Sequence, residues 1–339
     1  MSLPHAPPPL HRMNIEVGVS VPADMPLFID RHRIDLSQTV SQLLEANPRL
    51  QEGARTLKSK PAQIVEPKGL LYVQQREFAL TTPSDRSVSV IGSEDATTCH
   101  ILVLRHTGSG AVCLAHCDGM DTDAEVSVII RCVKSFSSKS GEGRSDVGRL
   151  EVHLVGGFND DRRLSQKLTN QLLNAFDKEK EEIHLVTLCA SEVNDKVEDG
   201  IHLPIIYGIA VNVKTAELFR ATFQDKGPEE DLRSARIFTG GSMITMYDAK
   251  TERLNIGPYL WRPFPLADFW LEQDDKRILQ NLSTSPLAEP PHFVAHMRST
   301  LMFLKNNPVP EKSIFPDKKP RTYKKNETGL WEIAVSDIV

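Results

Sequence analysis

A chain of 339 residues with 40% hydrophobic and 25% charged residues is long enough to bury a substantial core and has the composition of an ordinary globular protein. Its net charge is −5 and its lysine and arginine residues are scattered, so neither nucleic acid nor an anionic membrane surface is expected as a partner. No apolar run approaches the roughly 20 residues that a membrane-spanning helix needs.

The first residues give no sign of export from the cell. They contain no apolar core of a signal peptide, and Glu16 and Asp24 are atypical of a transit peptide. The five cysteines, an odd number at irregular spacing, form a poor disulfide framework. We therefore expect a cytoplasmic protein, possibly also nuclear, with free thiols.

In chain order, residues 1–24 are rich in proline and are expected to form a disordered N-terminal extension. A short amphipathic helix then carries Val40, Leu43 and Leu44 and is expected to stop at Pro48. Apolar or alternating runs between turn residues predict strands at 70–75, 77–82, 87–92, 100–106 and 111–116. The run 100–106 is almost wholly apolar, as in a central strand, and the turn at 107–110 predicts that it forms a hairpin with 111–116.

The second half alternates helices and strands less regularly. A helix is predicted at about 123–133, a polar surface loop at 135–148 and, after an Asp cap, an amphipathic helix at 161–176. The other expected elements are strands at 151–158, 183–190, 204–213 and 217–223, a hairpin within 240–257, and helices at about 274–282 and 291–306. We expect one domain, residues 25–310, followed by a loosely packed lysine-rich tail, 311–339.

The strands outnumber the helices and occur mostly in consecutive runs. This order indicates an α+β fold with helices segregated onto sheets, rather than a doubly wound parallel sheet. The chain also lacks the glycine-rich loops that bind nucleotide phosphates.

The segment 91–119 contains the candidate catalytic residues. Cys99 lies at the junction of a small polar stretch and the central strand, and His116 ends the next strand, so a hairpin would bring thiol and imidazole to the same end of the sheet. An imidazole within hydrogen-bond reach raises the thiolate fraction of a cysteine and can later protonate a leaving group. Ser93 could orient the imidazole through its second nitrogen, as a third member of a triad does.

Simpler interpretations of the same residues stay open at this point. A cysteine beside a strand is often only a small buried hydrophobic residue, and Ser93 could belong to a turn. Cys113, His116 and Cys117 could be zinc ligands, but no second pair of ligands is present, and Cys113 would face away from His116. His100 follows Cys99 on the opposite face of the strand and is expected to be structural.

A resemblance to a known family extends from about Met25 to the C-terminal region. The segments GSEDATTCH (92–100), RHTGSGAVCLAHCDG (105–119), LEVHLVGGFNDDRRLSQKLT (150–169), FQDKGPEE (223–230) and NLSTSPLAEPPHFVAHMRSTLMFLK (281–305) resemble the eukaryotic protein N-terminal asparagine amidohydrolase family. Members of that family usually begin Met-Pro-Leu, which corresponds to 25–27 here, so 1–24 are expected to be an extension. More distantly, Gly92-Ser93 ahead of Cys99, with a histidine 17 residues after the cysteine, is similar to bacterial chemoreceptor glutamine deamidases.

The resemblance implies an α-β-β sandwich of the cysteine deamidase (cytotoxic necrotizing factor-like) type. It implies Cys99 as the nucleophile, His116 as base and acid, and Ser93 as the residue that orients the imidazole. The implied reaction converts the side-chain amide of an N-terminal asparagine to aspartate through a thioester, releases ammonia and feeds the N-degron pathway of ubiquitin-dependent degradation. No organic cofactor or metal is implied.

The implied partners are proteins or peptides with a free N-terminal asparagine, and we expect the chain itself to be a monomer. The substrate's α-ammonium group needs an acidic contact, for which Glu94, Asp95 and Asp118, and also Asp121, are candidates, although each could be a solvated loop carboxylate. The alternative functions are a protein glutamine deamidase, or an acyl transferase like a transglutaminase, with the same Cys–His pair, and a non-catalytic adaptor that binds N-terminal asparagine. A zinc-stabilised interaction module is a further alternative.

Overall fold

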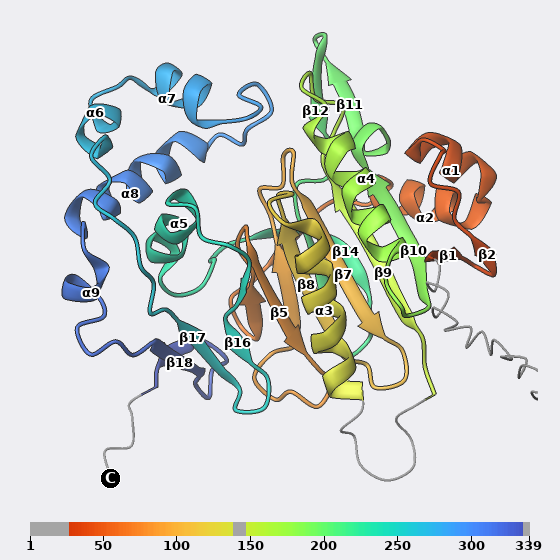
Figure 1. Ribbon diagram of the computed structural model, residues 1–339, viewed down its shortest axis with the longest axis horizontal. Helices are drawn as coiled ribbons and strands as arrows, with labels where there is room; N and C mark the ends of the chain where they lie inside the picture. The colour runs from red at the N-terminus through yellow and green to blue at the C-terminus, as the bar shows by residue number, and fades with distance from the viewer. Residues whose placement is uncertain (1–26, 138–146, 335–339) are drawn as a thin grey trace, which may run out of the picture.

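A computed structural model describes residues 27–137 and 147–334 (Figure 1). The expected N-terminal extension, 1–24, and most of the polar loop at 135–148 lie outside the described residues. Among the described helices, none is long and apolar enough to cross a membrane.

The centre of the molecule is a large mixed sheet. Its strand order is β15 (Ile244–Thr245), β5 (Glu77–Thr81), β8 (Val112–Cys117), β7 (His100–His106), β9 (Leu150–Gly156), β10 (Ile183–Ala190), β1 (Leu27–Ile29) and β2 (His32–Arg33). β7 and β8 pair antiparallel, which confirms the predicted hairpin, while β9 and β10 pair in parallel. Residues 101–104 of β7 are all at most 2% exposed, as expected for a central strand.

Two helices cover one face of this sheet, α3 (Thr122–Ser137) and α4 (Leu164–Asp177), as Figure 1 shows. Both alternate apolar and polar residues with helical spacing and bury the apolar face on the strands. The α4 helix begins after Arg163, and the side chain of Asp160 accepts hydrogen bonds from the backbone N–H groups of Leu164 and Ser165, both at 2.9 Å. Asp160 therefore supplies the predicted cap.

A second, smaller sheet packs against β8 through β6 (Val90–Ser93). Its strand order is β3 (Gln63–Val65), β14 (Leu218–Phe223), β13 (Ile209–Asn212), β6 and β4 (Leu70–Tyr72). Helices α1 (Val40–Ala46) and α2 (Pro48–Ser59) flank the structure beside β10. Helices thus lie outside and sheets inside, so the expected α+β class is confirmed.

The C-terminal third forms a separate helical layer at the left of Figure 1. It contains α5 (Glu230–Phe238), α6 (Ala267–Leu271), α7 (Asp275–Leu282), α8 (Phe293–Asn306) and α9 (Pro310–Ser313). Below it, a four-stranded sheet has the order β16 (Tyr247–Asp248), β17 (Arg253–Ile256), β18 (Arg321–Lys325) and β19 (Trp331–Ile333). The predicted hairpin within 240–257 corresponds to β16 and β17.

Two of the predicted elements have different bounds or partners in the structure. The helix that was expected to stop at Pro48 does end there, but Pro48 is the first residue of a second helix, where its missing N–H costs nothing. The run 204–213 is not one strand. It divides between β12 (Ile201–Pro204), which forms a hairpin with β11 (Asp195–Glu198) after the short helix η1 (Ser191–Asn194), and β13 of the smaller sheet.

The tail, expected to be loosely packed, is ordered as far as residue 334. Phe315 is 1% exposed, Tyr323 is 8% exposed, and β18 pairs with both β17 and β19. The ammonium group of Lys325 lies 4.4 Å from the ring centre of Trp331. Lys325 thus packs on an aromatic ring while keeping its charge, so a lysine-rich segment can still be packed.

Candidate active site

The large sheet and the smaller sheet meet at the residues that the sequence analysis singled out. Ile101 of β7 lies opposite His116 of β8. Cys99 precedes Ile101 by two residues, so its side chain shares a face of the sheet with His116, at the same end of the hairpin. The hairpin thus brings Cys99 and His116 to the same end of the sheet, as predicted.

Ser93 approaches His116 from the other sheet. Its Oγ lies 2.8 Å from His116 Nδ1, and the two side chains are 0% and 3% exposed. Within the described residues, His116 Nε2 has no hydrogen-bond partner. Cys99 is partly exposed, and both it and His116 line the same cavity. The imidazole is thus held through Nδ1, and its Nε2 has no partner among the described residues of a cavity that Cys99 also lines.

Burial keeps both candidate catalytic groups neutral at rest. Burial lowers the pKa of His116 to about 4, although the charge of Asp118 opposes this shift. Burial raises the pKa of the Cys99 thiol far above its usual value, and the carboxylates of Asp118 and Glu289 raise it further. A neutral thiol beside a neutral imidazole can exchange a proton only when something bound in the cavity stabilises the charged pair.

The cavity has a volume of about 550 Å³ and two chemically different sides. The side that we call the strand wall belongs to β4 to β8 and their connections and carries Tyr72, Glu94, Asp95, Cys99, His116 and Asp118. The side that we call the C-terminal wall comes from later in the chain and carries Lys226, Glu230, Ser234, Glu289, His292 and His296.

Two of the three predicted ammonium-binding carboxylates already have cationic partners. Asp95 accepts hydrogen bonds from Lys226 Nζ at 2.5 Å and His292 Nε2 at 2.9 Å. Burial alone would raise the pKa of Asp95, but these bonds bring it down to about 2. Asp118 is bound by Arg76 Nε at 2.6 Å and Gln75 Nε2 at 2.7 Å.

The third predicted carboxylate, Glu94, is less strongly paired. Its Oε1 lies 3.6 Å from Lys226 Nζ, and its Oε2 accepts the backbone N–H of Phe223 at 3.3 Å. Burial and the nearby charge of Asp95 raise its pKa to about 7. The other candidate, Asp121, lines a separate surface hollow that borders α4.

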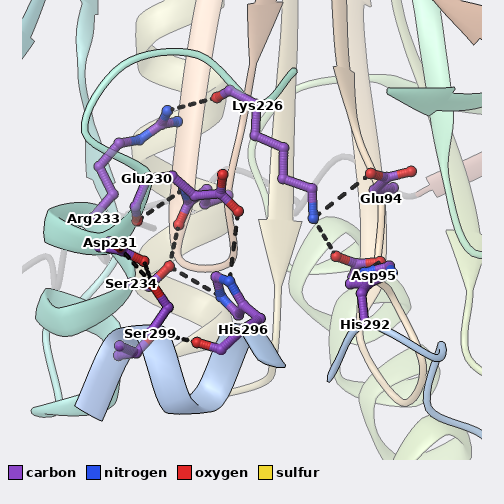
Figure 2. A network of polar contacts seen from close by, with 12 residues as sticks. Glu94, Asp95, Lys226, Glu230, Asp231, Arg233, Ser234, His292, His296 and Ser299 are labelled. Carbon is purple, nitrogen blue, oxygen red and sulfur yellow. Dashed lines mark hydrogen bonds and ion pairs between the residues drawn. The ribbon is translucent and has the colours of Figure 1, made fainter. Parts of the chain in front are cut away.

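Figure 2 shows how Lys226 joins the two walls. Its side chain extends from the loop after β14, and its ammonium group lies between Glu94 and Asp95. On the helical side, His296 lies 3.2 Å from Ser234 Oγ and 3.5 Å from Glu230. Lys226, Glu289, His292 and His296 were missed as site residues; they occur within segments that carried the family resemblance, but no spacing in the sequence relates them to Cys99.

The alternative roles considered for neighbouring residues find no support in the geometry. His100 faces the helices, where its Nε2 lies 2.6 Å from Thr169 Oγ1, as expected for a structural histidine. Cys113 and Cys117 are both 0% exposed within the core. In the described part of the chain, no group of three or more His, Cys, Asp or Glu side chains is placed to hold a metal ion.

Comparison with known proteins identifies relatives over most of the chain. The family model for protein N-terminal asparagine amidohydrolase matches residues 60–333. The protein of that name from Sus scrofa is 63% identical over 308 residues, covering 91% of this chain and 97% of the relative. The Homo sapiens protein of that name is 62% identical over 308 residues, with 91% and 98% covered. The Arabidopsis thaliana protein is 31% identical over 290 residues, with 77% and 80% covered.

Proposed function

The chain belongs to the protein N-terminal asparagine amidohydrolase family, and on that premise we propose that it deamidates the N-terminal asparagine of proteins and peptides through a thioester on Cys99. The observation that carries this proposal is the hydrogen bond between Ser93 and His116, which leaves His116 Nε2 without a partner among the described residues of the cavity. Binding of asparagine alone would not need such a base beside a thiol.

In the first half of the reaction, the Cys99 thiol gives its proton to His116 Nε2, and the sulfur attacks the side-chain amide carbon of the substrate. Backbone N–H groups beside Cys99 stabilise the negative charge that develops on the amide oxygen. When the C–N bond breaks, the imidazolium returns the proton to the nitrogen, so that ammonia leaves and a thioester remains. Ser93 fixes the imidazole by accepting the N–H of Nδ1.

In the second half, water replaces ammonia beside the thioester. His116 takes a proton from the water, whose oxygen attacks the same carbon, and the C–S bond breaks. The sulfur then recovers a proton from the imidazolium, and aspartate is released. These steps need only groups that the chain and water supply, and the low pKa of His116 keeps its imidazole in the neutral form, the form that can accept a proton, at neutral pH.

Glu94, Asp95 and Asp118 line the cavity, and Glu94, the least strongly paired of the three, suits a substrate that carries an α-ammonium group. We also propose that the fold is the α-β-β sandwich of the cysteine deamidases. Support comes from the layer order, in which α3 and α4 cover one face of the large sheet and the smaller sheet covers the other.

We test the reaction with purified protein and its Cys99→Ala variant. Each is incubated with a short Asn-initiated peptide, its N-acetylated form and a Gln-initiated peptide, and mass spectrometry follows the mass gain of about 1 Da on deamidation. Conversion of the free Asn peptide alone, abolished by the substitution, is the expected result. Conversion of Gln would instead indicate a glutamine deamidase, and binding without conversion of any peptide would indicate an adaptor.

The biological context is part of the same proposal. We propose that the chain acts as a monomer in the cytoplasm or nucleus and that its aspartate product enters the N-degron pathway. In cells, removal of the protein is expected to stabilise a reporter with an N-terminal asparagine but not one with an N-terminal aspartate. Equal stabilisation of both reporters would contradict the proposed place in that pathway.

A further inference from the structure

The acidic groups around the cavity differ in whether a cation of the protein already neutralises them. Asp95 has Lys226 and His292, and Asp118 has Arg76. A carboxylate that is paired in this way has little electrostatic attraction left for a ligand cation. The group that binds the substrate's ammonium should therefore be a carboxylate of the cavity that lacks its own cation.

Glu289 meets that condition. It lies on the C-terminal wall shortly before α8, is partly buried, and accepts a hydrogen bond of 2.5 Å from Ser283 Oγ. Among the residues that the structure describes, no lysine, arginine or histidine forms an ion pair with it. Burial raises its pKa to about 7, with Ser283 opposing the shift and the charge of Asp95 adding to it.

Glu289 lines the same cavity as the nucleophile Cys99. Its carboxylate is one of the charges that raise the pKa of the Cys99 thiol. A group that lines the same cavity as Cys99 is well placed to hold one end of an amino acid whose other end reacts with the sulfur. The hydrogen bond from Ser283 fixes where that group sits.

We propose that Glu289 binds the α-ammonium group of the substrate asparagine and thereby restricts the enzyme to free N-termini; this inference rests on the proposed deamidation. A partly buried carboxylate without a counterion gains most from a ligand that brings one. Three covalent bonds separate the α-nitrogen of asparagine from its amide carbon, and glutamine has one bond more. An ammonium held at Glu289 therefore sets which side chain brings its amide carbon to Cys99.

The bound ammonium would have a second effect. It neutralises the charge at Glu289 that disfavours the Cys99 thiolate, so substrate binding itself lowers the cost of forming the nucleophile. The neutral resting pair of Cys99 and His116 then becomes reactive only when a free N-terminus occupies the cavity.

The test compares two substrates that differ only in the α-amino group. One is a short Asn-initiated peptide, and the other carries a succinamoyl cap, which has the same side-chain amide but no amine. For the Glu289→Gln variant we expect kcat/KM on the Asn peptide to fall roughly 100-fold, as for loss of one partner of a buried charge pair. On the succinamoyl peptide, kcat/KM should not fall, because no ammonium is lost there and the charge of Glu289 disfavours the Cys99 thiolate.

Matched variants separate this role from its alternatives. Glu272→Gln, an exposed glutamate of the same layer, should leave both substrates unaffected. If Glu94→Gln shows the selective loss and Glu289→Gln does not, Glu94 binds the ammonium and the inference is overturned. Equal losses on both substrates in Glu289→Gln would also overturn it, because they indicate a structural defect.

Folding and the underlying reaction are checked separately. Thermal unfolding is measured for each variant, and Ser283→Ala provides a milder change that frees the carboxylate without removing it. We expect Ser283→Ala to reduce the preference for the Asn peptide over the succinamoyl peptide about 10-fold, and an unchanged preference would count against the inference. If the unmodified protein converts neither peptide, the proposed function itself fails, and the inference fails with it.

Discussion

The strand wall and the C-terminal wall of the cavity are built in different ways. Ser93, Cys99 and His116 lie within 24 residues of one another, on strands whose register is fixed by backbone hydrogen bonds. Lys226, Glu289 and His292 come from loops before helices and reach the cavity from more than 100 residues further along the chain. The comparison suggests that the sheets position the chemistry, whereas the helical layer recognises the substrate.

Removal of the base on the strand wall should have the largest effect. Because His116 transfers the proton in both halves of the proposed reaction, His116→Ala should lower kcat roughly 1,000-fold, with KM changed little. Steady-state kinetics on the Asn peptide measures this, with the exposed His32→Gln variant as control. If kcat were retained, another group would have to be the base.

The residue that orients the imidazole should matter less. Ser93→Ala removes the hydrogen bond to His116 Nδ1 but leaves the ring enclosed, so we expect kcat to fall roughly 10- to 100-fold. A positioning role predicts that the pH dependence of kcat also changes, because the pKa of the imidazole changes. An increase in KM with unchanged kcat would place Ser93 with the recognition residues instead.

The carboxylates of the cavity and the catalytic imidazole should differ in their response to pH. Glu289 has a pKa of about 7 and must be ionised to attract the ammonium, so kcat/KM should fall as the pH drops below 7 and approach a tenfold loss per pH unit. The pKa of Glu94 is also about 7. Asp95 raises both pKa values, while Lys226 lowers that of Glu94 and His292 lowers both. His116, with a pKa of about 4, stays neutral in this range.

Once the ammonium is bound, it keeps these carboxylates ionised. The acid limb of kcat should therefore lie at least one pH unit below that of kcat/KM, and rates measured from pH 5 to 9 separate the two. An acid limb near pH 6.5 in both profiles would instead indicate titration of an ordinary exposed histidine. That result would contradict the role of a carboxylate in binding the ammonium.

Loss of the lysine that links the walls should give the smallest effect. Lys226→Met removes a cation from between Glu94 and Asp95, so the pKa of Glu94 should rise further and KM should increase about 5-fold at pH 7. Among the described residues, Lys226 forms no hydrogen bond with Cys99 or His116 and only its charge acts on His116, so kcat should stay within about 2-fold. Lys226→Arg keeps the charge and serves as the control. A large drop in kcat for Lys226→Met would show that the C-terminal wall also contributes to the chemical step.

The difference between the strand wall and the C-terminal wall also explains which parts of the molecule could be predicted from the sequence. A turn between two apolar runs was enough to predict the hairpin, and the alternation of side chains along its strands then placed Cys99 beside His116. The α5 helix gave no comparable signal, because the residues it buries include Arg233 and Arg236, at 1% and 5% exposure. Arg233 is buried because it pairs with Glu77 on β5, and a pairing so distant in sequence leaves no local periodicity.

The prediction of a single strand at 204–213 was wrong for a related reason. The run 204–213 has strand propensity throughout, but its two ends pair with different partners, β11 and β6. Between them, an added Cβ at Gly208 would lie 2.6 Å from Glu94 Cβ, so the chain passes closely over the loop that leads to Cys99. Strand propensity indicates that residues will form a strand, but it does not determine with which other strand they will pair.

The high pKa of the Cys99 thiol also bears on the chemical durability of the protein. Oxidants such as hydrogen peroxide attack the thiolate, and burial keeps this thiol protonated at neutral pH. We therefore expect Cys99 to resist sulfenic acid formation while the cavity is empty and to become vulnerable only while a free N-terminus is bound. Under oxidative stress, the protein would then be inactivated most readily when most of its cavities are occupied by substrate.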